Sequence, residues 1–158
     1  MNIDNDEKKK IANELLVIFY KEHSLWARHQ ESQRSIVSNL LTTTSALLIG
    51  LITYDRKITF SDLPLSIFIF FVGLFGVLFV YKYYVQFKFH DNRIEGYKRE
   101  IYSIYSYIDF LEIERSSDDL TKRNFIFLSK LNLYKTWIFF HILIATTGLI
   151  LFLIAYNN

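Results

Sequence analysis

Three long stretches of the chain contain no Asp, Glu, Lys or Arg, and they restrict its possible folds more than any other feature. They cover residues 35–54, 63–81 and 136–158. A helix rises about 1.5 Å per residue, so about 20 residues cross the hydrocarbon core of a bilayer. The 158 residues include one Pro and five Gly, which leaves few places to break a helix. The stretches therefore predict an all-α membrane protein with three transmembrane helices.

The remaining segments are polar enough for water, and several have a helical period. We expect the three transmembrane helices to extend into a cytosolic helical bundle, partly because no stop signal separates Arg34 from Ser35. In chain order, the predicted parts are a cytosolic amphipathic helix (1–34), transmembrane helix 1 (35–54), a short external loop (55–62), transmembrane helix 2 (63–84), a cytosolic helical segment (85–135) and transmembrane helix 3 (136–156).

The second span is expected to continue into water as one helix from Leu63 to Glu114. Apolar residues follow the span at alternating steps of three and four, which is typical of a helical seam. This pattern predicts an oligomerisation stalk that pairs either within one chain or between chains. Ser116 to Asp119 then predict a turn and a new helix that runs into the third span. The stalk residues are Ile94, Tyr97, Ile101, Ile104, Ile108 and Leu111.

Basic residues predict the orientation of the spans. The segment before the first span holds 6 Lys and Arg, the first connection holds 2 and the long segment holds 10, of 18 in all. Because cytoplasmic loops are enriched in Lys and Arg, the short connection is expected outside and the N-terminus inside the cell. The lipid bilayer is therefore the first predicted partner, with the N-terminus on the cytoplasmic side.

Composition argues against several other classes of protein. The net charge is only +2 and the basic residues form no block, so nucleic acid is not an expected partner. The absence of Cys removes thiolate metal sites and cysteine nucleophiles. His23 and His29 are six residues apart, whereas a metal pair on one helix needs a spacing of four. We therefore expect neither an enzyme nor a bound cofactor or metal.

A polar stripe crosses the first predicted span. Ser35, Ser38, Thr42 and Ser45 recur at steps of three and four, so they share one helix face, with Asn39 beside them. Small hydroxyl residues allow close packing of helices in a membrane. Alternatively, the stripe lines a pore, which would require several copies because three helices cannot enclose a water channel. Both interpretations stay open.

The third predicted span holds one ionisable residue, His141, on the same face as Ala145 and Gly148. An intramembrane His can sense protons or line a pore, or it can be a neutral imidazole that is hydrogen-bonded or in contact with water. In the second span, Gly73 and Gly76 predict a close crossing with a neighbouring helix.

Trp26, Arg28 and Arg34 precede the first span and predict a juxtamembrane anchor, with Glu31 as an ion-pair partner. The alternative function for this cluster is binding of anionic lipid head groups or of a cytosolic ligand. Recognition of anionic lipids usually needs about 4–8 clustered basic residues, which favours the anchor.

The layout resembles the SLATT superfamily of small bacterial membrane effectors. The resemblance extends from the approach Leu25-Trp26-Ala27-Arg28 to Arg34, through the hairpin of residues 35–81, to the helical run of residues 83–114. It concerns architecture, covers about two thirds of the chain, and leaves the third span as an addition to the usual two-span plan.

The resemblance implies a homo-oligomeric effector that permeabilises or depolarises the inner membrane in anti-phage defence. It also implies a cytosolic protein or a sensor of a nucleotide signal as a possible partner. The alternative is a membrane-anchored adaptor or structural subunit that recruits a partner through its cytosolic helices.

Overall fold

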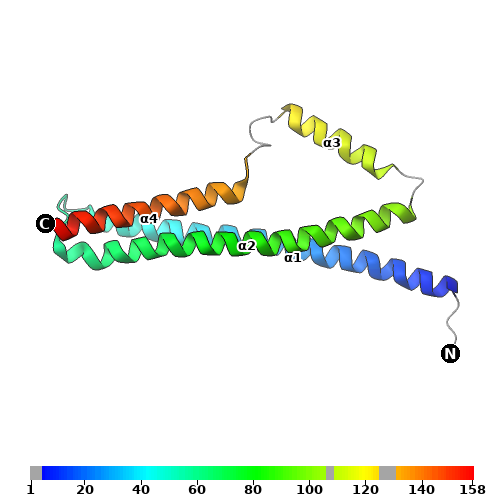
Figure 1. The fold of residues 1–158 in the computed structure, drawn as a ribbon, viewed down its shortest axis with the longest axis horizontal. Helices are drawn as coiled ribbons and strands as arrows, with labels where there is room; N and C mark the ends of the chain where they lie inside the picture. Colours follow the sequence, from blue (N-terminus) through cyan, green and yellow to red (C-terminus); the bar gives the residue numbers. More distant parts are fainter. Residues whose placement is uncertain (1–4, 106–108, 125–130) are drawn as a thin grey trace. The chain divides into compact units, whose positions relative to one another are not determined.

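The structure is a computed structural model that describes residues 5–105, 109–124 and 131–158. These residues are helical and form no strand, which confirms the all-α prediction for this part of the chain. Figure 1 shows the order of the elements, which are α1 (Asn5–Ile52), the 3₁₀ helix η1 (Phe60–Asp62), α2 (Leu63–Ile104), α3 (Phe110–Asn124) and α4 (Leu133–Asn157).

Helices α1, α2 and α4 are each long and apolar enough to cross a membrane. Helix α2 contains the whole of one charge-free stretch, and α1 and α4 contain all but the last residues of the other two. Helix α1 continues without a break through Arg34 and Ser35, and α2 continues past Tyr81 as far as Ile104. The predicted continuity of the first two spans with the neighbouring amphipathic segments is therefore confirmed.

The prediction of a single helix from Leu63 to Glu114 is wrong. Helix α2 ends at Ile104, and α3 begins at Phe110 after Asp109. The Asp109 carboxylate accepts a hydrogen bond of 2.9 Å from the backbone N–H of Glu112, as expected of a residue that caps a helix start. Among the stalk candidates, Leu111 thus belongs to α3, and Ile108 lies outside the described residues.

The turn predicted at Ser116 to Asp119 is also wrong, because these residues lie inside α3. The hydroxyls of Ser116 and Ser117 each donate a hydrogen bond of 2.9 Å to the Ile113 carbonyl, so both residues are compatible with the helix. Helix α4 begins afresh at Leu133, after the extended residue Asn132. The third span therefore does not continue the helix that precedes it.

The chain divides into two compact units, which we call unit 1 and unit 2. Unit 1 comprises residues 1–29 and 86–131, and unit 2 comprises residues 30–85 and 132–158. Helices α1 and α2 contribute residues to both units. Helix α3 belongs to unit 1, whereas η1 and α4 belong to unit 2.

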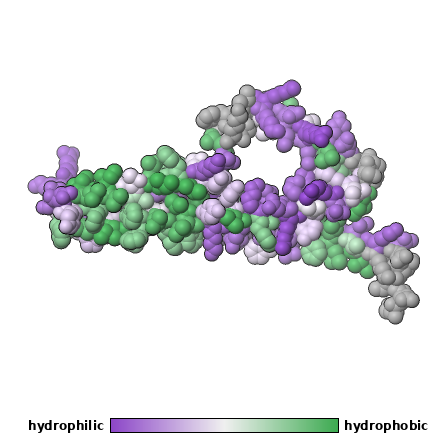
Figure 2. All heavy atoms as spheres, in the orientation of Figure 1, coloured by the Kyte–Doolittle hydropathy of each residue, from purple (hydrophilic) through white to green (hydrophobic). Residues whose placement is uncertain are grey.

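The apolar core of unit 2 lies near one end of its three helices. Ile52 of α1, Ile69 of α2 and Leu151 of α4 form a buried cluster. Outside this cluster, large apolar side chains such as Leu47, Phe71 and Ile150 are more than half exposed. Figure 2 shows the resulting hydrophobic surface of this unit in green. Exposed apolar side chains of this density suit a lipid environment, because lipid does not drive them inwards.

Glycines bring α2 and α4 into close contact in unit 2, which confirms the predicted crossing. A Cβ at Gly73 would lie 2.7 Å from the Ala145 Cα, and one at Gly148 would lie 2.8 Å from the Phe70 Cα. A Cβ at Gly76 would overlap the imidazole of His141. Only glycine therefore fits at these three positions, since real side chains do not approach other atoms so closely.

Replacing Gly148 by Leu should force α2 and α4 apart and destabilise unit 2 by about 1–3 kcal/mol, the usual cost of overpacking. Gly50→Leu is the matched control, because nothing lies within 4 Å of a Cβ at Gly50. Thermal denaturation of the purified protein in detergent measures the difference. Equal melting temperatures for the two variants would contradict the close contact.

Candidate functional site

The buried residues of unit 2 include several polar ones, which is unusual for helices of this hydrophobicity. Arg34, Ser38, Ser45, Ser66 and His141 are each at most 4% exposed. The set on α1 and α4 is the candidate functional site, because polar residues buried within apolar helices are costly and commonly mark functional positions. We call this set the polar interior: Arg34, Ser38, Thr42 and Ser45 of α1, with His141 of α4.

The polar stripe of α1 faces the inside of this chain's own helix bundle. Ser38 and Ser45 are 1% exposed, Ser35 and Thr42 are partly buried, and Asn39 is exposed on another face. The Ser45 hydroxyl donates a 2.8 Å hydrogen bond to the Leu41 carbonyl. This placement is what close helix packing requires. Lining of a pore between copies of the chain stays a prediction.

His141 is enclosed by the close contact between α2 and α4. Its side chain is fully buried against the bare backbone of Gly76. The Trp137 ring, one turn earlier on α4, stacks at 6.4 Å between ring centroids. Neither ring nitrogen of His141 has a hydrogen-bond partner among the described residues. The described residues therefore offer the imidazole no hydrogen-bond partner, and its contact with water stays a prediction.

Other buried polar atoms of unit 2 share this lack of partners within the described residues. They are Gln30 Oε1, Arg34 Nε, Ser38 Oγ and Thr42 Oγ1. An unpaired buried donor or acceptor costs about 1–3 kcal/mol, whereas an apolar residue of the same shape would cost little. A membrane bundle built only for stability would not retain this set, which favours a functional role.

The three anchor candidates occupy different settings. Arg34 is 4% exposed inside unit 2, where its guanidinium forms an ion pair with Glu31. Trp26 and Arg28 belong to unit 1 and are exposed, and the Arg28 Nε donates to the Ser24 carbonyl at 3.3 Å. Arg34 is buried because it lies one turn before Ser38, on the same inner face of α1.

Unit 1 contains a histidine pair that sequence analysis did not predict. The Nδ1 atoms of His23 on α1 and His90 on α2 lie 2.9 Å apart, which places one shared proton between them. Tyr97 stacks on the His23 ring at 5.6 Å, and Trp26 stacks on the His90 ring at 6.1 Å. Sequence analysis provided only the six-residue spacing of His23 from His29, and only the register of α1 against α2 identifies the partner of His23.

Part of the predicted stalk packs within the chain. Tyr97 also stacks on Phe19 of α1, at 6.0 Å between ring centroids. Ile94 and Ile101 are partly buried, while Ile104 is 42% exposed. At Tyr97 the seam thus pairs α2 with α1 of the same chain, and pairing between chains stays a prediction.

A cluster of three polar side chains joins α3 to α2 in unit 1. The Tyr102 hydroxyl donates a 2.5 Å hydrogen bond to Glu114, and the Lys98 ammonium forms an ion pair with the same carboxylate. The Tyr102 ring stacks on Phe110 at 4.6 Å. Hydrogen bonds from Lys98 and Tyr102 lower the pKa of Glu114, while burial and the bond to Glu114 raise the pKa of Tyr102. These contacts fix α3 by its first turns.

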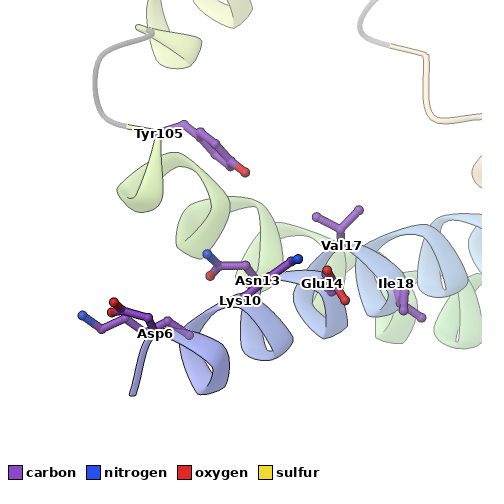
Figure 3. Close-up of a pocket in the computed structure, with 8 residues that line it drawn as sticks. Asp6, Lys10, Asn13, Glu14, Val17, Ile18 and Tyr105 are labelled. Atoms are coloured by element: carbon purple, nitrogen blue, oxygen red, sulfur yellow. The ribbon is translucent and has the colours of Figure 1, made fainter. Parts of the chain in front are cut away.

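An open groove of about 700 Å³ lies in unit 1, beside the first turns of α1. Figure 3 shows Tyr105 on one side and α1 side chains such as Asn13 and Val17 on the other. Its lining includes Asp6 and Glu14 together with two lysines. Acidic and basic groups are thus balanced, so the groove has no evident electrostatic preference for an anion or a cation.

No group of three or more His, Asp or Glu side chains gathers into a metal-binding set within residues 5–105, 109–124 and 131–158. No protein-family model, curated protein or solved structure matches the chain. The SLATT resemblance therefore stays an expectation.

The histidine pair predicts that unit 1 loses stability in acid. Burial, His23 and Arg93 lower the pKa of His90 below its ordinary value of 6.5. Unfolding then takes up a proton, so this stabilisation is complete above pH 6.5 and disappears as the pH falls through the lowered pKa. Helix content by circular dichroism during thermal melts, compared between roughly pH 7 and pH 5, should show the loss.

His90→Phe should flatten this pH dependence, since it removes the titrating ring and keeps the stacking on Trp26. His29→Phe is the control, because His29 is exposed and contacts Trp26 only edge to face. If His90→Phe and wild type lose the same stability in acid, the pair does not control the response.

Proposed function

We propose that this chain is a membrane effector that permeabilises the bilayer as a homo-oligomer, using the polar interior of unit 2. The observation that supports this proposal is the set of buried polar side chains on helices that could cross a membrane. Polar residues within spans are costly and commonly mark a pathway for ions or substrates.

Opening of the helix bundle would cost few hydrogen bonds at these polar side chains. Ser38, Thr42 and His141 have no hydrogen-bond partners to lose among the described residues when α1 separates from α2 and α4. Opening therefore breaks no hydrogen bond between these side chains and the rest of the described chain, and it would bring them to the water of the shared pathway. Several copies are needed, since three helices cannot enclose a channel. In the open state the inner face of α1 would line the shared pathway.

The cellular setting of the proposal follows the distribution of Lys and Arg and the SLATT resemblance. The N-terminus and residues 85–135 would lie in the cytoplasm, and the short connection would lie outside the bacterial inner membrane. The trigger would be a cytosolic protein or a sensor of a nucleotide signal, in anti-phage defence. Unit 1 would offer such a signal its own surfaces, including α3.

Ser38→Leu combined with Thr42→Leu should abolish permeabilisation, because it replaces the hydroxyls of the proposed lining with apolar groups. Thr43→Leu is the matched control, since Thr43 is exposed on a different face of α1. The measurement is the collapse of membrane potential in cells that overexpress each variant to the same level. An unchanged collapse in the double variant would refute the role of the stripe.

A second candidate function is that of a membrane-anchored adaptor, and α3 supports it. Ile113 and Leu120 lie seven residues apart on one face of this helix and are 56% and 60% exposed, although the helix is fixed to α2 through Glu114. An amphipathic helix with exposed apolar side chains is a common element for binding a partner protein.

The adaptor function predicts a stable protein partner and no change in membrane potential. Leu120→Glu should remove that partner from the complex purified with mild detergent, because it places a charge on the apolar face of α3. Lys122→Glu introduces the same carboxylate on the opposite face and should retain the partner. Retention by both variants would exclude this face of α3 as the binding surface.

A further inference from the structure

The unpaired polar groups of unit 2 are arranged in order along the bundle. Among the described residues they comprise Gln30, Arg34, Ser38 and Thr42, spaced by four residues on one face of α1, and both ring nitrogens of His141 on α4. A spacing of four residues rises about 6 Å, and these side-chain atoms form no direct hydrogen bond to one another. A water molecule with hydrogen bonds to both neighbours can span such a distance.

His141 and Thr42 lie at about the same depth in unit 2. Ile52 of α1 and Leu151 of α4 belong to one buried cluster near the same end of their helices. Thr42 precedes Ile52 by ten residues and His141 precedes Leu151 by ten residues, which is about 15 Å in each helix. Ser38 lies one turn further along α1. We call these three residues the polar layer, because Ser38 and His141 are at most 1% exposed and the hydroxyl oxygen of Thr42 is buried.

The surroundings of this layer contain few charges. Residues 35–54 of α1 and 63–81 of α2 include no Asp, Glu, Lys or Arg, and α2 presents the backbone of Gly76 to the His141 ring. Trp137 covers the ring from α4. The nearest charged side chain of the interior is Arg34, two turns before Thr42, and Glu31 pairs with it. Nothing in the layer except His141 exchanges a proton near neutral pH.

We propose that His141, Thr42 and Ser38 form a binding site for water and a proton, and that the proton is the ion this protein conducts. The inference rests on the proposed permeabilising function and names its ion. One ring nitrogen takes a proton from hydronium and leaves water, which gives an imidazolium. The other ring nitrogen then releases its proton to water on the opposite side. The neutral ring and a new hydronium result, and the hydroxyls hold the water on either side.

The test uses the full chain in vesicles of phosphatidylethanolamine and phosphatidylglycerol that contain a pH-sensitive dye. A potassium diffusion potential drives protons inwards. Wild type should acidify the lumen faster than protein-free vesicles, and His141→Phe should return the rate to that of protein-free vesicles. Thr146→Val is the matched control, because Thr146 is exposed and its hydroxyl bonds to the Ile142 carbonyl of its own helix. It should behave as wild type.

Ser38→Ala combined with Thr42→Val provides a second test that keeps the imidazole, in case His141→Phe does not fold. It should also slow acidification, because the water would lose its hydroxyl partners. Equal proton flux in wild type and in either folded variant would overturn the proposal, as would no flux in wild type. The proposal would also be overturned if His141→Phe had a higher melting temperature than wild type and an unchanged proton flux. That result would show that the imidazole of His141 binds no water and has no hydrogen-bond partner.

Potassium efflux from the same type of vesicle distinguishes a failure of the proton site from a failure of the permeabilising function. If wild type and His141→Phe both release potassium while proton flux does not depend on His141, the permeabilising function stands and the proton site fails. If wild type releases neither ion and does not depolarise cells, the permeabilising function itself fails.

Discussion

The close contact of α2 with α4 is the interaction on which the candidate site depends. Gly73, Gly76 and Gly148 have no side chains, so the two backbones approach and His141 becomes fully enclosed. In a lipid environment, apolar burial gives little drive for helix association, and the contact has to come from packing. Glycine is therefore a requirement at this crossing, and a larger residue would remove the enclosure of the imidazole along with the contact.

The inside and the outside of unit 2 differ in polarity. Large apolar side chains cover the outside of unit 2, while hydroxyls, an imidazole and a guanidinium occupy its inside. This distribution suits a bundle that rests in lipid and has polar groups available when the helices separate. In the described part of unit 1, by contrast, no buried side-chain nitrogen or oxygen lacks a hydrogen-bond partner. The His23–His90 pair and the Lys98, Tyr102 and Glu114 cluster each link two helices through paired groups.

Sequence patterns predicted long elements well and helix boundaries poorly. Charge-free stretches of about 20 residues leave helices as the main option, because every backbone N–H and C=O needs a partner in lipid. The single helix predicted from Leu63 to Glu114 was wrong, because α2 ends at Ile104 and α3 begins at Phe110. An apolar period of three and four can continue across two separate helices. Ser116 and Ser117 predicted a turn where the chain is helical, because a serine hydroxyl can form a hydrogen bond to a backbone carbonyl in a helix as well as in a turn.

The sequence by itself determined that α1, α2 and α4 are long apolar helices, that Ser38, Thr42 and Ser45 share one face, and that glycines mark a crossing. These properties follow from local period and composition. Only the tertiary structure decided which surface each face contacts: that the stripe of α1 faces inwards, that Arg34 is buried, that His141 lies on Gly76 and that His23 meets His90. Such contacts depend on the register between helices far apart in the chain, which no local pattern specifies.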